Sequence, residues 1–134
     1  MLNEVMYNPE GDENENEYIE LYNNDITPIN LSEWRVTDGG DTDRIAAFEQ
    51  GLQVYPGQYI LILDPDYFEN GSTQYDGRIP EGALVVTIDN GAFGERGLSN
   101  SNAETVSILN DAGLCVAAYT YSLGNQSGYS DEKI

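Results

Sequence analysis

Apolar and polar residues alternate along most of this chain. Residues 17–23 (EYIELYN) show the alternation most clearly, with Ile19 and Leu21 on one face of an extended chain and Tyr18, Glu20 and Tyr22 on the other. Successive side chains point to opposite faces of a β-strand, so this pattern predicts a half-buried strand. The same pattern and shorter apolar runs predict about eight short strands. They span residues 2–7, 17–23, 34–37, 44–48, 58–63, 84–88, 104–109 and 114–121.

Clusters of Gly, Pro, Asn and Asp separate the predicted strands and supply the residues that turns require. The only helical signal is one short turn near residues 65–70, where Asp64 is placed to cap and Pro65 to occupy the first helical position. This turn lies in the long segment 64–83. The acid-rich residues 10–17 are predicted to form one solvated loop. The pattern therefore predicts one all-β domain over residues 1–134, a sandwich or a barrel with at most that one helical turn.

Charge and composition narrow the functions open to such a domain. The chain carries 24 Asp and Glu against 5 Lys and Arg, a formal net charge of −19. This charge argues against binding nucleic acid or anionic membranes, and no apolar run is long enough to cross a bilayer. Histidine is absent, which removes Ser-His-Asp and Cys-His nucleophilic systems and imidazole metal sites. Cys115 is the single cysteine, so no intrachain disulfide forms.

Five stretches of the sequence together resemble the bacterial branch of the lamin-tail domain family. They are LNEVMYNP (2–9), EYIELYN (17–23), INLSEW (29–34), YPGQYILIL (55–63) and GLSNSNAETVSILNDAG (97–113). Two positions depart from the family pattern: Glu33 stands where a glycine usually precedes the tryptophan, and Asp131 stands where a leucine is usual.

The resemblance implies an immunoglobulin-like β-sandwich with no catalytic residues and no cofactor. It also implies an accessory domain of a larger bacterial protein that is secreted or lies on the cell surface, where it mediates interaction with a protein or surface partner. The chain enters a predicted strand directly after Met1 and ends at Ile134 without a tail, so we expect a domain excised from a longer protein.

The first alternative is a calcium-binding adhesion or stabilising module. If successive strands alternate in direction, the loops at 8–16, 38–43, 64–83 and 110–113 share one end of the sandwich and hold most of the loop carboxylates. The loops at 24–33, 49–57 and 89–103 then share the other end. Calcium binds six to eight oxygens, which neighbouring loops can supply together. The candidate ligands are Asp38, Asp41, Asp43, Asp64 and Asp66. The competing interpretation is that these acids are turn residues and solubilising charge.

Aromatic residues of the 64–83 segment offer a candidate partner-binding surface. Tyr67, Phe68 and Tyr75 lie in this one segment, and such side chains provide broad contact area at low entropy cost. The competing interpretation is that the segment folds its own aromatics back over the sandwich. Two further alternatives are a hydrolase using paired carboxylates and a homodimer formed through edge strands.

Overall fold

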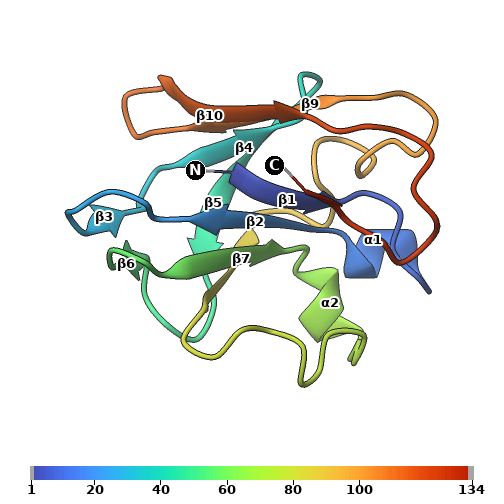
Figure 1. The fold of residues 1–134 in the computed structure, drawn as a ribbon, viewed down its shortest axis with the longest axis horizontal. Helices are drawn as coiled ribbons and strands as arrows, with labels where there is room; N and C mark the ends of the chain where they lie inside the picture. Colours follow the sequence, from blue (N-terminus) through green and yellow to red (C-terminus); the bar gives the residue numbers. More distant parts are fainter. Residues whose placement is uncertain (1, 133–134) are drawn as a thin grey trace.

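The computed structural model describes residues 2–132, which form eleven strands and two short helices (Figure 1). In chain order these are β1 (Leu2–Met6), α1 (Glu13–Asn16), β2 (Tyr18–Tyr22), β3 (Ile29–Asn30), β4 (Arg35–Thr37), β5 (Thr42–Ala47), β6 (Gln53–Val54), β7 (Tyr59–Leu63), α2 (Asp66–Glu69), β8 (Leu84–Ile88), β9 (Thr105–Leu109), β10 (Cys115–Thr120) and β11 (Asp131–Glu132). All eight predicted strands are present. The three strands that the pattern did not predict, β3, β6 and β11, have only two residues each.

Nine of these strands form one sheet that folds over on itself. Their order is β10-β9-β4-β5-β8-β7-β2-β1-β11, and β3 and β6 form a separate two-stranded ribbon. Strand β5 makes the corner between the two layers, because its residues 42–44 pair with β4 and its residues 45–47 pair with β8. The sheet curls far enough that β10 and β1, near its two ends, come into contact (Figure 1). The chain is therefore a two-layered all-β domain of the immunoglobulin-like kind.

The alternation of the sequence places the hydrophobic core between the two layers. Ile19 of β2 and Ile62 of β7 are fully buried from one layer, and Val106 and Ile108 of β9 face them from the other. Burial of each such side chain contributes about 1.5–3 kcal/mol to stability. Near the end of β10, the rings of Tyr7 and Tyr121 stack with centroids 4.5 Å apart.

The acid-rich stretch at residues 10–17 is not the single solvated loop that was expected. Residues 13–16 form α1, and the side chain of Asp12 caps it by accepting a hydrogen bond of 3.2 Å from the Glu15 backbone N–H. An acceptor followed three residues later by an acid is a capping pattern, so this signal was present in the sequence. The helix turns Asn16 and Glu17 into the interior.

The predicted helical turn in the 64–83 segment is confirmed as α2. The Asp64 carboxylate accepts a hydrogen bond of 2.9 Å from the Asp66 backbone N–H, which holds the chain as it leaves β7. Helices α1 and α2 are in contact at the same end of the sandwich (Figure 1).

Glu33 is the only residue other than glycine with a positive φ, 63°, among residues 2–132. We expect Glu33→Gly to raise the unfolding free energy by about 1 kcal/mol. A left-handed backbone costs an L-residue about 1–2 kcal/mol, and the freedom that glycine gains in the unfolded chain offsets part of this. The 3.6 Å ion pair of Glu33 with Arg44 is exposed and contributes little. Urea unfolding measures the change, with Ser32→Gly as the neighbouring control that is expected to destabilise. A Glu33→Gly variant less stable than the natural chain would contradict the expectation.

Candidate functional site

The loops divide between the two ends of the sandwich differently from the sequence expectation. Strands β7 and β8 pair in parallel, whereas the expectation assumed that every successive strand reverses direction. Segment 64–83 therefore runs from one end to the other, loop 89–103 joins the acidic end, and loop 110–113 lies at the opposite end. Two hydrogen bonds show the new position of loop 89–103: the Leu98 N–H donates to Glu17 at 3.0 Å and the Gly94 N–H donates to Asp43 at 2.7 Å.

The five candidate calcium ligands all lie at or near the acidic end, but four of them accept hydrogen bonds from other groups of the chain. Asp38 accepts from the backbone N–H groups of Gly40 and Asp41, and Asp41 accepts from Thr42. The buried Asp43 accepts from Gly94 and from the side chain of Asn90. The contacts of Asp38 and Asp41 are those of turn-forming acids, and the contacts of Asp43 hold loop 89–103 against β5. Within residues 2–132, no group of three or more His, Cys, Asp or Glu is arranged to hold a metal ion.

Asp64 differs from the other four because one of its oxygens is buried and has no hydrogen-bond partner among residues 2–132. The side chain is fully buried; Oδ1 accepts from the Asp66 N–H at 2.9 Å, and Oδ2 makes no hydrogen bond. Burial raises the pKa of Asp64 to about 7, and the nearby charges of Asp66 and Asp43 add to the rise. A proton on this carboxyl is therefore readily held near neutral pH.

Glu17 is the most strongly perturbed acid of this end. Its side chain is 1% exposed, and both carboxylate oxygens lie 3.0 Å from the Leu98 backbone nitrogen. Burial raises its pKa to about 9; the Leu98 hydrogen bond lowers it, and the charge of Asp64 raises it further. A group with this pKa is neutral at physiological pH, so Glu17 acts as a protonated structural side chain that ties loop 89–103 to the entrance of β2.

The aromatic residues of the 64–83 segment mostly face inward, as in the competing interpretation that the segment folds its own aromatics back over the sandwich, and they do not form the candidate partner-binding surface. Tyr67 and Tyr75 are 3% and 8% exposed and stack with ring centroids 5.6 Å apart. The Tyr75 N–H also donates to the Tyr67 hydroxyl at 2.9 Å. Phe68 is half-buried and stacks on Phe48, with centroids 3.9 Å apart. These residues close a small second core over the outer face of β7.

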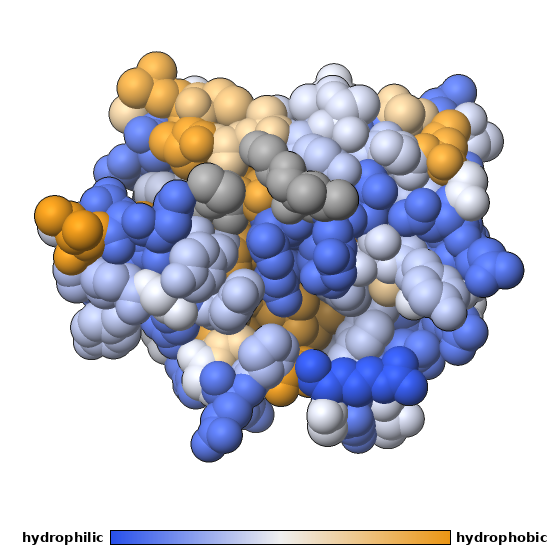
Figure 2. All heavy atoms as spheres, viewed as in Figure 1, coloured by the Kyte–Doolittle hydropathy of each residue, from blue (hydrophilic) through white to orange (hydrophobic). Residues whose placement is uncertain are grey.

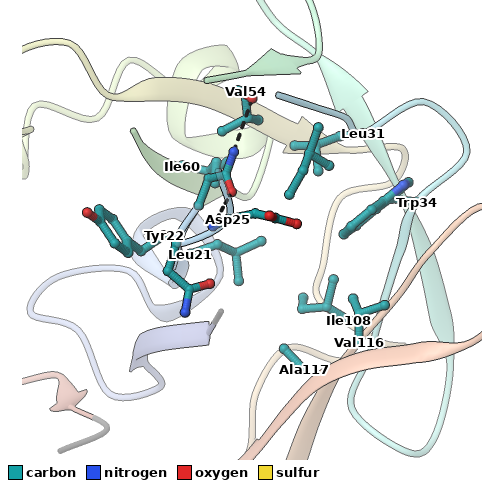
Figure 3. Close-up of a pocket in the computed structure, with 13 residues that line it drawn as sticks. Leu21, Tyr22, Asp25, Leu31, Trp34, Val54, Ile60, Ile108, Val116 and Ala117 are labelled. Atoms are coloured by element: carbon teal, nitrogen blue, oxygen red, sulfur yellow. Dashed lines mark hydrogen bonds between the residues drawn. The ribbon is translucent and has the colours of Figure 1, made fainter. Parts of the chain in front are cut away.

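The opposite end of the sandwich carries a feature that the sequence did not predict. An apolar cavity of about 240 Å³ opens there, between the ends of β2 and β7 in one layer and β9 and β10 in the other (Figure 3). Its apolar walls include side chains that point toward one another in Figure 3: Leu21, Leu31, Trp34, Val54, Ile60, Ile108, Val116 and Ala117. Ile29 also lines it. We call it the end cavity.

A short polar loop forms the rim of the end cavity. Asn23 is buried and fixes this loop, since its side chain donates to the carbonyls of Thr27 at 3.2 Å and Val54 at 3.3 Å. It also accepts from the Asp25 N–H at 3.0 Å. This network presents the exposed Asp25 carboxylate at the rim, where Asp25 is the one charged residue among those that line the cavity (Figure 3).

Exposed apolar side chains surround the same end. Ile26 in the loop before β3 is 91% exposed, Leu114 in the β9–β10 turn is 64% exposed, and Val116 is 49% exposed. Figure 2 shows apolar atoms gathered at the left of the view, where the β9–β10 hairpin and β3 lie in Figure 1. Exposed apolar residues that gather around a cavity mark an interaction site more often than the same residues scattered singly. In the sequence, Leu114 and Val116 were indistinguishable from core residues of an ordinary strand.

Within residues 2–132, no helix is long and apolar enough to cross a membrane.

The comparisons with known proteins identify the family. Searches of curated proteins and of solved structures returned no match. The family model described as Lamin Tail Domain matches residues 1–122, nearly the whole chain. The curled, two-layered β fold agrees with it, and the chain therefore belongs to the Lamin Tail Domain family.

Proposed function

We propose that this chain is a non-catalytic accessory module of a larger secreted or cell-surface protein, and that it binds a protein partner at the end cavity. The observation that carries the proposal is the cavity itself, an apolar opening into the core bordered by exposed apolar residues. Family membership supports an immunoglobulin-like interaction module without catalytic residues.

The free energy gained by burying apolar surface favours partner binding at the end cavity over binding at the acidic end. A partner that covers Val116, Leu114 and Ile26 removes apolar surface from water, which contributes about 25 cal/mol per Å² before the costs of association. At the acidic end, the carboxylates of Glu17, Asp38 and Asp43 instead accept hydrogen bonds from backbone N–H groups of the chain's own loops.

Selection from a displayed library of random peptides tests this proposal without knowledge of the natural partner. Peptides enriched on the folded chain should lose at least about tenfold in affinity for Val116→Glu, because that change places a charge at the cavity wall. Val116 is half-exposed, so the variant should still fold. Ala103→Glu, an exposed alanine in the loop between β8 and β9, is the matched control and should bind as the natural chain does. Enriched peptides that bind Val116→Glu unchanged would refute the proposal.

The second candidate function is a calcium-stabilised module, favoured by the buried, unpartnered Oδ2 of Asp64. A cation there would need backbone oxygens and water in addition to the Asp64 carboxylate, because no three acids of residues 2–132 are arranged to hold a metal ion together. Thermal unfolding in chelator, then in millimolar calcium or magnesium at constant ionic strength, tests it. A calcium-selective rise of several degrees would support this function by mass action, and equal curves in the two ions would remove it.

A further inference from the structure

The free edge of β10 borders the end cavity. Strand β10 is the last strand on its side of the sheet and pairs only with β9 among residues 2–132. It carries no charged residue and no proline, the features that usually protect an edge strand from pairing with another chain. Four of its six residues are exposed. Such an edge is a template for an added strand.

Among residues 2–132, the contacts that close the gap between β10 and β1 lie near one end of β10. Near the acidic end, Asp131 accepts hydrogen bonds from the Tyr119 hydroxyl at 2.8 Å and from the Ser122 N–H at 2.6 Å. The stacked rings of Tyr7 and Tyr121 close the same part of the gap. At the other end of β10, Val116 and Ala117 instead line the end cavity. The template edge and the cavity are thus adjacent.

The size of the cavity fits one apolar side chain. An apolar cavity of about 150 Å³ is enough to bind a benzene molecule in another protein, and the end cavity measures about 240 Å³. In an extended segment, alternate side chains point to the same side. A segment laid along β10 would place one leucine- to phenylalanine-sized side chain into the cavity and leave its neighbours outside.

The charge of the chain indicates which kind of partner supplies the segment that pairs with β10. A second copy of this chain would bring a net charge of −19 against −19, and an anionic partner would meet the same repulsion. The carboxylate of Asp25 stands at the mouth of the cavity. Arg44 lies within ion-pair distance of Glu33 and Asp89, at 3.6 and 3.9 Å, so it is already engaged with acids of this chain. A cationic segment is therefore the occupant that electrostatics favours.

We propose that the partner segment is an extended, positively charged peptide that pairs along the free edge of β10 and inserts one apolar side chain into the end cavity, beside Asp25. This rests on the proposed function and adds the chemistry of the partner. Strand pairing supplies backbone hydrogen bonds, the cavity selects the apolar side chain, and the negative charge of the chain selects flanking Lys or Arg.

Four five-residue peptides with blocked ends test the proposal by NMR titration of the full chain. Three have a central leucine flanked on both sides by paired lysines, serines or glutamates, and the fourth has a central glycine flanked by lysines. We expect the lysine–leucine peptide to shift the backbone signals of Val116 and Ala117 and the indole signal of Trp34. It should bind at least about tenfold more tightly than the serine peptide at low salt, with the advantage shrinking as salt is added.

Four other outcomes of these titrations would overturn part or all of the proposal. Equal affinity of the lysine and serine peptides would overturn the charge assignment and leave the cavity as the binding site. No binding of any leucine peptide at the cavity would overturn both this inference and the proposed function. Equal binding of the lysine–glycine and lysine–leucine peptides would reduce the effect to diffuse attraction and overturn the inference. Self-association in sedimentation that blocks the peptide would assign the edge to a second copy instead.

The Asp25→Asn variant gives the sharpest control. The Asp25 carboxylate accepts a hydrogen bond of 2.7 Å from the Ile26 N–H, and the amide oxygen of asparagine can accept the same bond. We expect it to weaken the lysine–leucine peptide about threefold and to leave the serine peptide unchanged. Glu81→Asn, an exposed acid that does not line the cavity, should change neither peptide. Equal weakening by both variants would show that the whole charge of the chain acts and that Asp25 has no special part.

Discussion

The unfolding free energy of this chain should fall as pH rises from about 5 to 8, and Glu17→Gln should remove much of that fall. Burial raises the pKa of Glu17 from 4.5 to about 9, so between these values the folded chain keeps a proton that the unfolded chain has lost. The unfolded state then binds fewer protons, and stability decreases as pH rises. The loss of stability caused by Glu17 is absent below its pKa in the unfolded chain and reaches its full size above its pKa in the folded chain.

The size of this effect can be bounded. One proton held only by the folded state costs about 1.4 kcal/mol per pH unit, hence at most about 4 kcal/mol between pH 5 and 8; we expect about 2–3 kcal/mol. Burial raises the pKa of Asp64 as well, which adds to the slope in the same direction. The glutamine variant carries no proton to lose, so it should gain relative to the natural chain at pH 8 and differ little near pH 4.

Urea unfolding of the natural chain and of Glu17→Gln at several pH values measures the effect. Glu81→Gln is the matched control, because it removes one carboxylate from an exposed position and thereby reports the general repulsion of a highly negative chain. The difference between the two variants isolates the buried group. A Glu17→Gln variant that keeps the full slope of the natural chain would show that Glu17 is ionised in the fold.

Phe93→Ala should lower the unfolding free energy by about 3–5 kcal/mol. Phe93 is 1% exposed and packs in the main core, although it lies in loop 89–103, which has no regular strand. Its backbone neighbour Gly94 donates to the buried Asp43 at 2.7 Å, so loss of the ring also loosens a hydrogen bond that satisfies a buried carboxylate. The variant should therefore speed hydrogen exchange at the Gly94 and Leu98 amides.

Phe48→Ala is the comparison that separates core packing from loss of a phenyl ring in general. Phe48 is 41% exposed and stacks only at the surface, on Phe68, so its removal should cost about 1 kcal/mol. Urea unfolding gives both values. Equal losses for Phe93→Ala and Phe48→Ala would mean that loop 89–103 is not anchored through the core.

The strands were predictable because burial on one face imposes a period of two on the sequence. The register of β2 against β7, Ile19 opposite Ile62 and Leu21 opposite Ile60, joins two segments whose apolar faces were evident from sequence alone. Helix α1 was missed because its acidic residues were assigned to solvent, although Asp12 and Glu15 form a capping pattern. Glu33, which has a positive φ, occupies the position where the resemblance to the family predicts a glycine.

The candidate site was not predictable, for two physical reasons. The arrangement of loops depends on strand direction. Because β7 and β8 pair in parallel, loop 89–103 lies at the end of the sandwich opposite to the one that was assumed. Burial of the aromatics and opening of the cavity depend on how the layers pack. Tyr75 in a long loop is buried, whereas Val116 in an apolar strand is half-exposed. An alternating pattern predicts which face of a strand a residue occupies. It does not predict whether another layer covers that face.

A backbone amide chemical-shift map of the natural chain, recorded as the tightest peptide from the displayed library is added, shows whether the partner binds at the end cavity. We expect the largest changes on Asp25, Trp34, Ile108, Val116 and Ala117, which line the end cavity. Changes confined to residues 38–43 and 94–104 at the acidic end, with the cavity signals unmoved, would contradict this expectation.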